Sequence, residues 1–361
     1  MRIEELWRKT VSGEKGLAYS FFRFFLSILT IPYLIGFFLF RKIQSHRAVK
    51  LPCPVIGIGN ITLGGTGKTS LAILLGRKLE EMGLKIAILC TGYGGKRGGK
   101  VKGKTVEEVG DEAVLLSKCL RKGDVWAGRD RLKMAREALR EGVEVIILDD
   151  SMQYFKIKKD LEIAMLNAFS PFGYGYLFPR GALREPISGL RRADIIILTN
   201  SDLVENKGKI VERIKEINPK ALIVEANYKA KGLFDISGEE FREIEWLRGR
   251  RVRGIAGIGC PEGFRKSLEG LVGETVFRSL PDHYSYKCED IKRLEEEARE
   301  KGLEAIVITE KDGVKIKELM EQGCTFKVPI LILRAELTLS PEDVFWEKVQ
   351  EAVRKVSIPY R

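Results

Sequence analysis

Histidine is rare in this 361-residue sequence, and its cysteines form no metal-binding pattern. The chain has two histidines, His46 and His283, and six scattered cysteines without a CxxC pair. A structural zinc site needs closely spaced cysteine and histidine ligands, so the sequence argues against one. Scattered cysteines fit a reduced cytosolic compartment.

Acidic residues are scarce near the N-terminus. Residues 1–50 hold nine Lys or Arg and three Asp or Glu, so half of the net charge of +12 lies there. A basic segment beside apolar residues indicates an anionic membrane surface rather than nucleic acid. The sequence also lacks the stacking-aromatic motif of RNA-binding modules, internal repeats and long low-complexity tracts. We therefore expect no nucleic-acid partner, and no obligate protein partner is evident.

The stretch 17–40 is almost entirely apolar and long enough to span a bilayer. Arg23 interrupts it, Pro32 is expected to kink it, and Arg23, Ser27 and Thr30 share one helical face. These features favour a monotopic helix in the membrane interface over a span, with a soluble core helix as the remaining alternative. No small-residue cleavage site follows, which argues against a signal peptide. Basic residues after the stretch place the remainder of the chain in the cytoplasm.

A glycine-rich stretch, GNITLGGTGKTS at residues 59–70, follows an apolar run that predicts a buried strand. Its glycines allow a tight turn that points N–H groups inward, and residues 70–82 predict a helix. This order is typical of a phosphate-binding loop, in which Lys68 reaches the outer phosphates and Thr69 reaches Mg²⁺. The general pattern has glycine where Thr62 stands, and a glycine-rich turn with a chance GKT is the alternative. The predicted nucleotide-binding residues are Thr62, Gly64, Gly65, Thr66, Gly67, Lys68, Thr69 and Ser70.

Strand and helix patterns alternate from residue 51 onward, which predicts an α/β fold. Repeated strand–helix units imply a parallel sheet covered by helices, with ligands at the carboxyl ends of the strands. We expect a P-loop kinase-type domain at 51–200 and a second, smaller α/β domain at 201–361, after a membrane-associated helical segment at 1–50. The predicted strands are 55–58, 86–90, 143–150, 161–166, 193–198, 221–226, 251–259, 303–309 and 328–333.

Two carboxylates, Asp149 and Asp150, end the predicted strand 143–150. In a phosphate-loop enzyme a carboxylate at this point holds Mg²⁺ directly or through water, although solvated acids are also common at strand ends. Gln153 lies one turn further and could add a neutral ligand or orient a water molecule.

A second acidic pair, Asp111 and Glu112, begins a predicted helix after Gly110. Aspartate is a preferred N-cap residue, so a capping role is one interpretation. The functional interpretation makes Asp111 a base and associates Glu112 with the metal.

Two basic stretches, 129–131 and 180–192, could provide arginine forks for phosphate groups on ATP or on an anionic acceptor. Solvated faces are the alternative. His283 lies in a predicted loop beside Asp282 and Tyr284, where a functional role is more common than at an average position.

Taken together, these stretches resemble the tetraacyldisaccharide 4′-kinase family, LpxK of the lipid A pathway, over nearly the whole chain. That family shares the threonine at position 62. The matching motifs, besides the apolar N-terminus, are GNITLGGTGKTS (59–70), TGYGG (91–95), GDE (110–112), RDR (129–131), LDDSMQYFKIKKDLEI (148–163), FPRGALREPISGLRRAD (178–194), GIGCPEGF (257–264), PDHY (281–284) and TEKD (309–312).

The resemblance implies a reaction in which the γ-phosphate of ATP moves to the 4′-hydroxyl of a tetraacylated disaccharide 1-phosphate. It also implies a site at the cytoplasmic face of a Gram-negative inner membrane and two α/β domains that close over a cleft. Asp111 matches the catalytic base and His283 the histidine that works with it. The positions that match groups around the metal and phosphates are Glu112, Asp149, Asp150 and Gln153, and those that match the basic, substrate-binding groups are Arg131 and Arg184.

The chain departs from the family pattern at two places. Cys90 and Thr91 stand where the family usually has Ser-Arg, and Ser151 and Tyr154 replace the glycine and histidine of DDGxQH. Two other classes share the phosphate loop: a membrane-attached NTPase switch, which would hydrolyse ATP without a lipid acceptor, and a non-catalytic nucleotide-binding scaffold, which would tolerate loss of Asp111.

Overall fold

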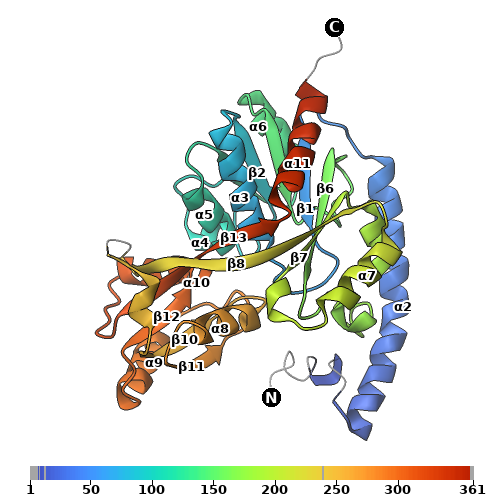
Figure 1. The fold of residues 1–361 in the computed structure, drawn as a ribbon. Coiled ribbons are helices and arrows are strands. Elements are labelled where there is room, and N and C mark those ends of the chain that lie inside the picture. The colour runs from blue at the N-terminus through green and yellow to red at the C-terminus, as the bar shows by residue number, and fades with distance from the viewer. Residues whose placement is uncertain (1–6, 8, 12–13, 238–239, 358–361) are drawn as a thin grey trace. The chain divides into compact units, whose positions relative to one another are not determined.

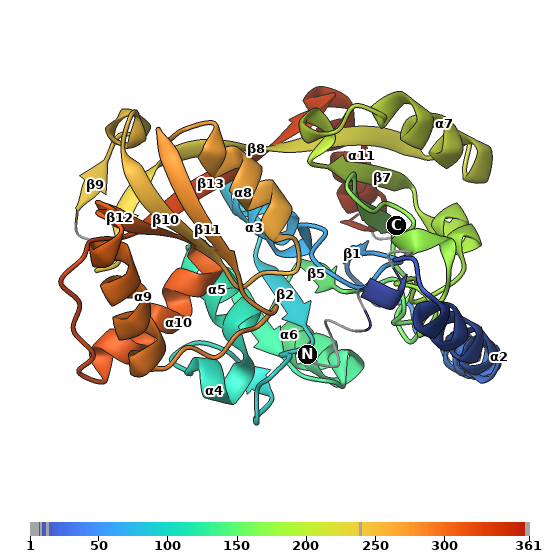
Figure 2. The same ribbon diagram turned by 90° about the horizontal axis from the view of Figure 1, so that it is seen from below.

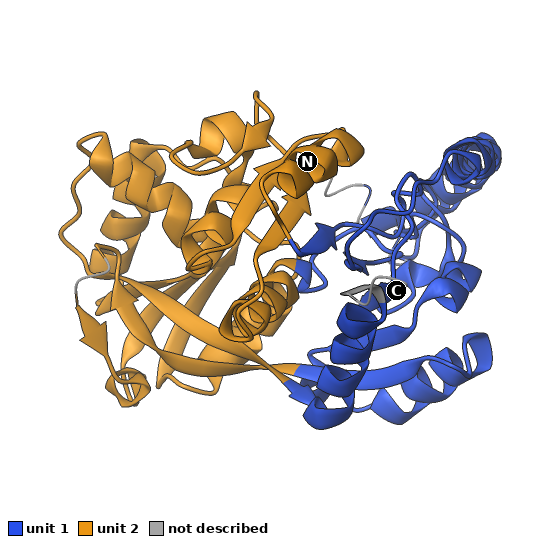
Figure 3. Cartoon of the chain, turned by 90° about the horizontal axis from the view of Figure 1, so that it is seen from above, with its two compact units in different colours: residues 1–68, 144–226, 339–361 blue, residues 69–143, 227–338 orange. Residues whose placement is uncertain are grey.

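The computed structural model describes residues 7, 9–11, 14–237 and 240–357, and the chain forms two compact units (Figure 3). Unit 1 comprises residues 1–68, 144–226 and 339–361, and unit 2 comprises residues 69–143 and 227–338. Each unit is thus assembled from segments far apart in the sequence. The three-part division expected from the sequence has other boundaries and stays a prediction. Its first part includes residues 1–6, 8, 12 and 13 and its last part residues 238, 239 and 358–361, which lie outside the described residues.

Unit 1 contains a parallel sheet with the strand order β8–β7–β6–β1–β5. The strands β1 and β5–β7 are buried along their whole length, which is why they are apolar runs rather than alternating patterns. Their bounds are β1 (Val55–Gly59), β5 (Val145–Asp149), β6 (Leu161–Asn167), β7 (Ile195–Thr199) and β8 (Leu222–Asp235), of which residues 222–226 belong to this unit. The helices are α2 (Leu17–His46), α7 (Lys207–Ile217) and α11 (Glu342–Ser357), with short 3₁₀ turns η1 (Gly173–Gly175), η2 (Ile187–Arg192) and η3 (Ser201–Leu203).

The core of unit 1 fills the space between this sheet and its neighbouring helices. Leu166 and Leu198 from the strands pack with Leu190 of η2 and Ile214 of α7. Because the strands are parallel, their carboxyl ends share one edge, where polar residues follow the apolar runs. These residues are Asn60, Asp149, Asp150, Asn167 and Thr199.

Unit 2 contains two sets of strands. β2 pairs with β4 in parallel and β4 with β3 antiparallel, and a second set has the order β11–β10–β12–β13–β8, with β9 antiparallel to β8. The strands are β2 (Ile86–Cys90), β3 (Gly99–Lys100), β4 (Asp124–Ala127), β9 (Phe241–Arg242), β10 (Arg251–Ala256), β11 (Glu274–Ser279), β12 (Ala305–Thr309) and β13 (Ile330–Ser340). The helices are α3 (Lys68–Glu81), α4 (Val106–Val109), α5 (Asp111–Cys119), α6 (Arg131–Arg140), the 3₁₀ turn η4 (Ile244–Leu247), α8 (Pro261–Glu269), α9 (Cys288–Glu300) and α10 (Glu310–Glu321).

Helices cover both faces of the second set of strands in unit 2 (Figure 2). Ile306 and Ile308 pack with residues of α9 and α10, whereas Ala305 and Val307 pack with Leu268 of α8. The period of two therefore fixes which helices cover which face. This packing holds the end of β12 and the start of α10, where several site residues lie.

The long apolar helix α2, labelled in Figure 1, belongs to unit 1. It continues through Pro32, and by length and composition it could cross a membrane, although a single such helix is weak evidence. Its half-buried residues recur every three or four positions, which marks one stripe along the helix. Large apolar side chains elsewhere on the helix are exposed, among them Phe21, Phe24, Ile31, Ile35 and Ile43.

Most predicted strands and helices form within one or two residues of their expected bounds. The mixed, mostly parallel α/β fold is confirmed. One covalent feature was not expected: Cys288 and Cys324 form a disulfide. The two residues are 36 positions apart and meet because α9 begins near the chain segment that follows α10, so their spacing does not predict the pairing.

Candidate active site

The phosphate loop follows the strand β1 and ends where α3 begins at Lys68. Gly64 and Gly67 have φ angles of 103° and 86°, which a residue with a side chain rarely adopts. The loop carbonyl of Gly65 accepts a hydrogen bond from Asn167 Nδ2 at 3.0 Å, and that of Thr66 accepts one from Thr199 Oγ1 at 3.3 Å. Residues at the ends of β6 and β7 thus hold these carbonyls.

Thr62 and Ser70 flank this loop. Thr62 is buried, and its backbone pairs with Leu183 in an antiparallel bridge. In unit 2, Ser70 Oγ accepts a hydrogen bond from Tyr228 at 3.4 Å.

A polar network in unit 1 joins Lys68 to the end of β5. Lys68 Nζ lies 3.3 Å from Asn60 Oδ1 and 3.7 Å from Asp150 Oδ1. Arg184 donates to both oxygens of Asp150, at 2.6 and 2.9 Å, and to Asn60 Oδ1 at 3.2 Å. Burial disfavours the charged form of Arg184, but the Asp150 carboxylate favours that form more strongly, so the pKa of the guanidinium is raised. Asp150 itself has a φ of 50°, a strained conformation of the kind that collects at functional sites.

Gln153 extends this network within unit 1. Its Nε2 donates to Asn60 O at 2.8 Å and to Glu185 Oε1 at 2.7 Å. Its Oε1 is buried and has no hydrogen-bond partner among the described residues. Asp149 is buried at the end of β5.

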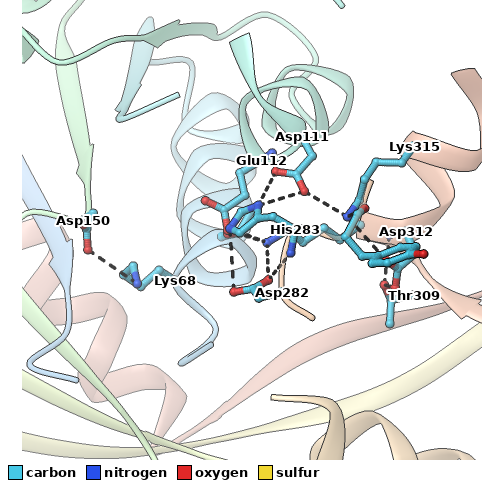
Figure 4. A network of polar contacts seen from close by, with 12 residues as sticks. Lys68, Asp111, Glu112, Asp150, Asp282, His283, Thr309, Asp312 and Lys315 are labelled. Carbon is cyan, nitrogen blue, oxygen red and sulfur yellow. Dashed lines mark hydrogen bonds and ion pairs between the residues drawn. The ribbon is translucent and has the colours of Figure 1, made fainter. Parts of the chain in front are cut away.

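Asp111 and His283 meet in unit 2, although they are 172 residues apart in the sequence (Figure 4). His283 Nδ1 lies 2.9 and 3.1 Å from the two carboxylate oxygens of Asp111. Lys315 Nζ lies 3.3 Å from Asp111 Oδ2. The carboxylate is buried at the start of α5, and the imidazole is partly exposed.

Neighbouring charges set the ionisation of this pair. Burial disfavours the charged form of Asp111, but the hydrogen bond from His283 and the ammonium groups of Lys311 and Lys315 outweigh it, so its pKa lies well below the usual value. Burial also opposes protonation of His283, yet the Asp111 carboxylate outweighs burial and the nearby Lys311, so the pKa of the imidazole is raised. Asp111 is therefore an ionised carboxylate at neutral pH.

The backbone around the pair is constrained. His283 has a φ of 57°, and the ring of Tyr93 lies 4.9 Å from its imidazole, centroid to centroid. Gly110, the residue before Asp111, has a φ of 90°, and a Cβ there would lie 2.3 Å from Tyr93 O. A larger residue at 110 would displace Tyr93 or Asp111, so glycine is needed at this position.

Glu112 links the Asp111–His283 pair to the phosphate-loop helix. Its Oε1 lies 3.5 Å from Thr69 Oγ1 and 3.1 Å from Lys311 Nζ. Arg131, the first residue of α6, is buried and lies in the same unit. The described part of the chain contains no group of three or more His, Cys, Asp or Glu side chains placed to hold a metal ion.

The family model for "Tetraacyldisaccharide-1-P 4'-kinase" matches residues 23–354 of the chain. The chain belongs to the tetraacyldisaccharide 4′-kinase family. A tetraacyldisaccharide 4′-kinase of Syntrophus aciditrophicus is 35% identical over 356 residues, which are 92% of this chain and 94% of that protein. One of Elusimicrobium minutum is 36% identical over 318 residues, covering 82% and 83% of the two chains.

A solved structure of the tetraacyldisaccharide 4′-kinase family supports the same assignment. The crystal structure of LpxK from Aquifex aeolicus in complex with ATP matches with a TM-score of 0.64 and 29% identity, covering 90% of this chain and 99% of that one. Membership of the kinase family confirms that the chain is an enzyme and confirms the resemblance noted in its motifs.

The structure divides the predicted residues of this family member between two clusters, each within one unit. Unit 1 brings Lys68, Asp150 and Arg184 together, and unit 2 brings Asp111, Glu112 and His283 together with Thr69. Sequence reasoning assigned no role to several residues of these clusters, all of which except Lys315 lie in a quoted motif. They are Asn60, Glu185, Asp282, Lys311 and Lys315.

The two departures from the family pattern differ in their surroundings. Ser151 is buried, and its hydroxyl donates to Glu162 in unit 1. Tyr154 is buried too, with its carbonyl accepting a hydrogen bond from Lys159. Thr91 in unit 2 is half-buried and begins the TGYGG segment.

The raised pKa of His283 predicts a pH-dependent contribution to stability. The protonated imidazole stabilises the fold below the unfolded pKa of about 6.5, and this contribution is lost as the pH rises through the folded value. In urea unfolding, His283→Gln should therefore destabilise the protein more at pH about 5.5 than at pH about 8.5. His46→Gln, which removes the other histidine without touching Asp111, is the control. An equal loss of unfolding free energy in His283→Gln at both pH values would contradict a raised pKa for His283.

Proposed function

We propose that the enzyme transfers the γ-phosphate of ATP to the 4′-hydroxyl of a tetraacylated disaccharide 1-phosphate in lipid A synthesis. The observation that carries the proposal is the Asp111–His283 pair, with 2.9 Å between Nδ1 and a carboxylate oxygen. Membership of the tetraacyldisaccharide 4′-kinase family supports the reaction, and the LpxK structure in complex with ATP supports ATP as the phosphate donor.

The phosphate loop binds ATP in this proposal. Backbone N–H groups of residues 64–69 surround the phosphates, and Lys68 reaches the outer ones. The contacts from Asn167 and Thr199 to the loop carbonyls support this, because they fix the peptide groups whose N–H ends face the other way. Thr62, Thr66 and Ser70 complete the binding segment.

Asp111 accepts the proton of the 4′-hydroxyl while that oxygen forms a bond to the γ-phosphorus and the bond to the β–γ bridging oxygen breaks. ADP leaves with the bridging oxygen. The lowered pKa of Asp111 keeps the carboxylate ionised at neutral pH, so its oxygens can accept a hydrogen bond from the 4′-hydroxyl. His283 donates to Asp111 from Nδ1 and holds it in place.

The oxygen donors around the loop fit Mg²⁺. The buried Gln153 Oε1, which has no hydrogen-bond partner among residues 14–237 and 240–357, is a suitable neutral ligand, and the hydroxyl of Thr69 beside Glu112 is another typical oxygen donor. Following the resemblance to the kinase family, we propose that Thr69, Glu112, Asp149, Asp150 and Gln153 would hold the ion, although the described structure does not group their three carboxylates beforehand. When bound, it would neutralise negative charge on the phosphates.

Two arginines, Arg131 and Arg184, are assigned to substrate phosphate groups. The Arg184 guanidinium already makes a two-pronged contact with the Asp150 carboxylate, the geometry that suits phosphate oxygens. Arg131 is buried at the first position of α6.

The helix α2 is proposed to lie on the cytoplasmic surface of a Gram-negative inner membrane. Residues 17–50 include no acidic residue. Tyr33 Oη donates to Arg184 O at 2.7 Å, and Gln44 Oε1 accepts from Phe155 N at 3.2 Å. Because other residues of unit 1 contact the middle and the end of α2, lipid can reach only the faces of the helix that point away from these contacts, which favours a monotopic helix.

We propose a division into three parts: a membrane segment at 1–50, a nucleotide domain at 51–200 and a domain at 201–361 that closes over the cleft.

Charges on the exposed apolar side of α2 should weaken membrane binding. The double variant Ile28→Asp, Ile35→Asp places two carboxylates on the exposed apolar side of the helix. Moving these carboxylates into the membrane interface costs free energy. We expect at least about tenfold less protein to sediment with phosphatidylglycerol-containing vesicles. Ser27→Asp with Ser45→Asp adds the same charge at exposed polar positions of the same helix and is the control. Equal sedimentation of the two double variants would contradict a specific apolar contact.

An assay with γ-³²P-labelled ATP tests the proposed reaction. The full chain in detergent is given the tetraacylated disaccharide 1-phosphate or no acceptor, and label is measured in lipid and in free phosphate. We expect lipid-dependent transfer that far exceeds hydrolysis. Hydrolysis at one rate with and without lipid would instead indicate an NTPase switch.

A further inference from the structure

Two lysines on the first turns of α10 contact the Asp111–His283 pair and its neighbours in unit 2. Lys311 Nζ lies 3.1 Å from Glu112 Oε1, 3.3 Å from Asp282 Oδ1 and 3.4 Å from His283 Nε2. Lys315 Nζ lies on the other side of Asp111, at 3.3 Å from Oδ2. The helix therefore presents two ammonium groups to one small cluster.

The surroundings of Lys315 and Lys311 differ. Lys315 is buried and also contacts Asp312 and the carbonyl of Tyr284, so its ammonium group is enclosed by fixed oxygens. In this enclosed position the ammonium group of Lys315 acts as a fixed counter-ion for the Asp111 carboxylate. Lys311 is slightly more exposed, and its partners Glu112 and Asp282 are part-exposed side chains.

We propose that Lys311 is a phosphate-binding catalytic residue that contacts the γ-phosphoryl group and stabilises its charge during transfer. This inference rests on the proposed function. It adds an ammonium group from α10 to the one that the phosphate loop supplies through Lys68. Positioned cations at a phosphoryl group are the main source of catalysis in reactions of this type.

The shared contact with Glu112 places Lys311 near the path of the phosphoryl group. One oxygen, Glu112 Oε1, contacts both Lys311 Nζ and the hydroxyl of Thr69, which in a phosphate loop serves the ion at the β- and γ-phosphates. On its other side Lys311 meets the His283 imidazole, whose Nδ1 contacts the proposed base. Its ammonium group thus lies between the nucleotide side and the acceptor side of the cluster.

Local structure indicates that Lys311 is not there to stabilise its helix. A positive charge in the first turn of a helix opposes the helix dipole, and Glu310 and Asp312 on either side are the charges that the dipole favours. Burial lowers the pKa of Lys311, but Glu112, Asp111 and Asp282 outweigh burial, so its pKa is raised and the group stays cationic. Thr309 caps the helix by accepting from Asp312 N, which fixes the turn that carries the lysine.

The affinities for ATP and ADP test the inference, because ADP lacks the γ-phosphate. For Lys311→Gln in the full chain with Mg²⁺, titration calorimetry should give about tenfold to 100-fold weaker ATP binding, as expected for a lost charge-assisted hydrogen bond, and unchanged ADP binding. Lys311→Arg keeps the charge and should retain most of the ATP affinity. Lys317→Gln, on the same helix with its Nζ 2.8 Å from Ser237 O, is the matched control.

Several results would overturn the inference. They are equal loss of ATP and ADP affinity, full ATP affinity in Lys311→Gln, or loss of the ATP preference in Lys311→Arg as severe as in Lys311→Gln. If Lys311→Gln does not fold, Lys311→Arg is compared with the wild-type enzyme, and a selective loss of its ATP affinity would overturn the inference. These titrations need no lipid acceptor, so a failure of lipid phosphorylation by the wild-type enzyme would count against the proposed function and not against this contact.

Discussion

Asp111→Asn is expected to lower kcat for lipid phosphorylation by about 10²- to 10⁴-fold, the usual contribution of a positioned base. The amide keeps the size of the carboxylate but cannot accept the proton of the 4′-hydroxyl. ATP affinity should stay within about threefold of wild type, because the phosphate loop is untouched. Single-turnover transfer of ³²P to the lipid, with ATP binding measured separately, gives both numbers.

A nearby acid that lies outside the cluster controls for the change in charge. Glu107, in α4, is exposed and contacts Lys96, so Glu107→Gln should leave kcat unchanged. If Asp111→Asn also kept wild-type turnover, Asp111 would not be the base. His283→Gln should lower kcat less than Asp111→Asn, since it removes a group that acts through the carboxylate.

Lys68→Met is expected to reduce kcat/KM for ATP by about 10²- to 10³-fold, as for the loss of one donor to a transferring phosphoryl group. Methionine keeps the apolar stem of the side chain and removes the ammonium group, which lies near Asn60 and Asp150. Initial rates over a range of ATP concentrations measure the effect.

The same change on the same helix provides the control. Lys78, in the last turn of α3, pairs with Glu81 at 3.7 Å and is about half exposed, so Lys78→Met should behave as wild type. Comparable kcat/KM values for Lys68→Met and the wild-type enzyme would exclude the proposed role of the loop lysine.

Apolar runs made much of the fold predictable. β2 spans the expected residues 86–90, and α3 (Lys68–Glu81) covers most of the expected helix 70–82, because a strand buried on both faces and an amphipathic helix leave strong local patterns. Other elements carried weaker signals. The second half of β8, residues 227–235, is not predicted because it contains no continuous apolar run. The helix α10 is not predicted because it follows β12 without a loop.

Local motifs located the groups of the site but not their partners. The phosphate loop and the GDE segment are short-range patterns, so Lys68 and Asp111 could be proposed from the sequence. The pairing of Asp111 with His283, and the approach of Lys311 to both, depend on how α5, α10 and the loop before α9 pack. Such long-range contacts leave no periodic trace, and here they were expected only through resemblance to the family.

Backbone strain adds information that the sequence does not contain. Asp150 and His283 have φ angles of 50° and 57°, a region that few residues other than glycine adopt, although Asp and His adopt it more often than most. Such conformations persist where surrounding contacts enforce them, and they are common at functional sites. Asp150 and His283 thus lie one in each cluster, whereas Tyr174 and Asn200, which also have positive φ, lie outside both clusters.

A structure of the enzyme with a non-hydrolysable ATP analogue, Mg²⁺ and the lipid acceptor would test the account most directly. We predict the 4′-hydroxyl within hydrogen-bond distance of the Asp111 carboxylate and in line with the γ-phosphorus, with His283 Nδ1 still bound to Asp111. An acceptor hydroxyl far from Asp111, or a His283 side chain directed away from the γ-phosphate, would contradict it.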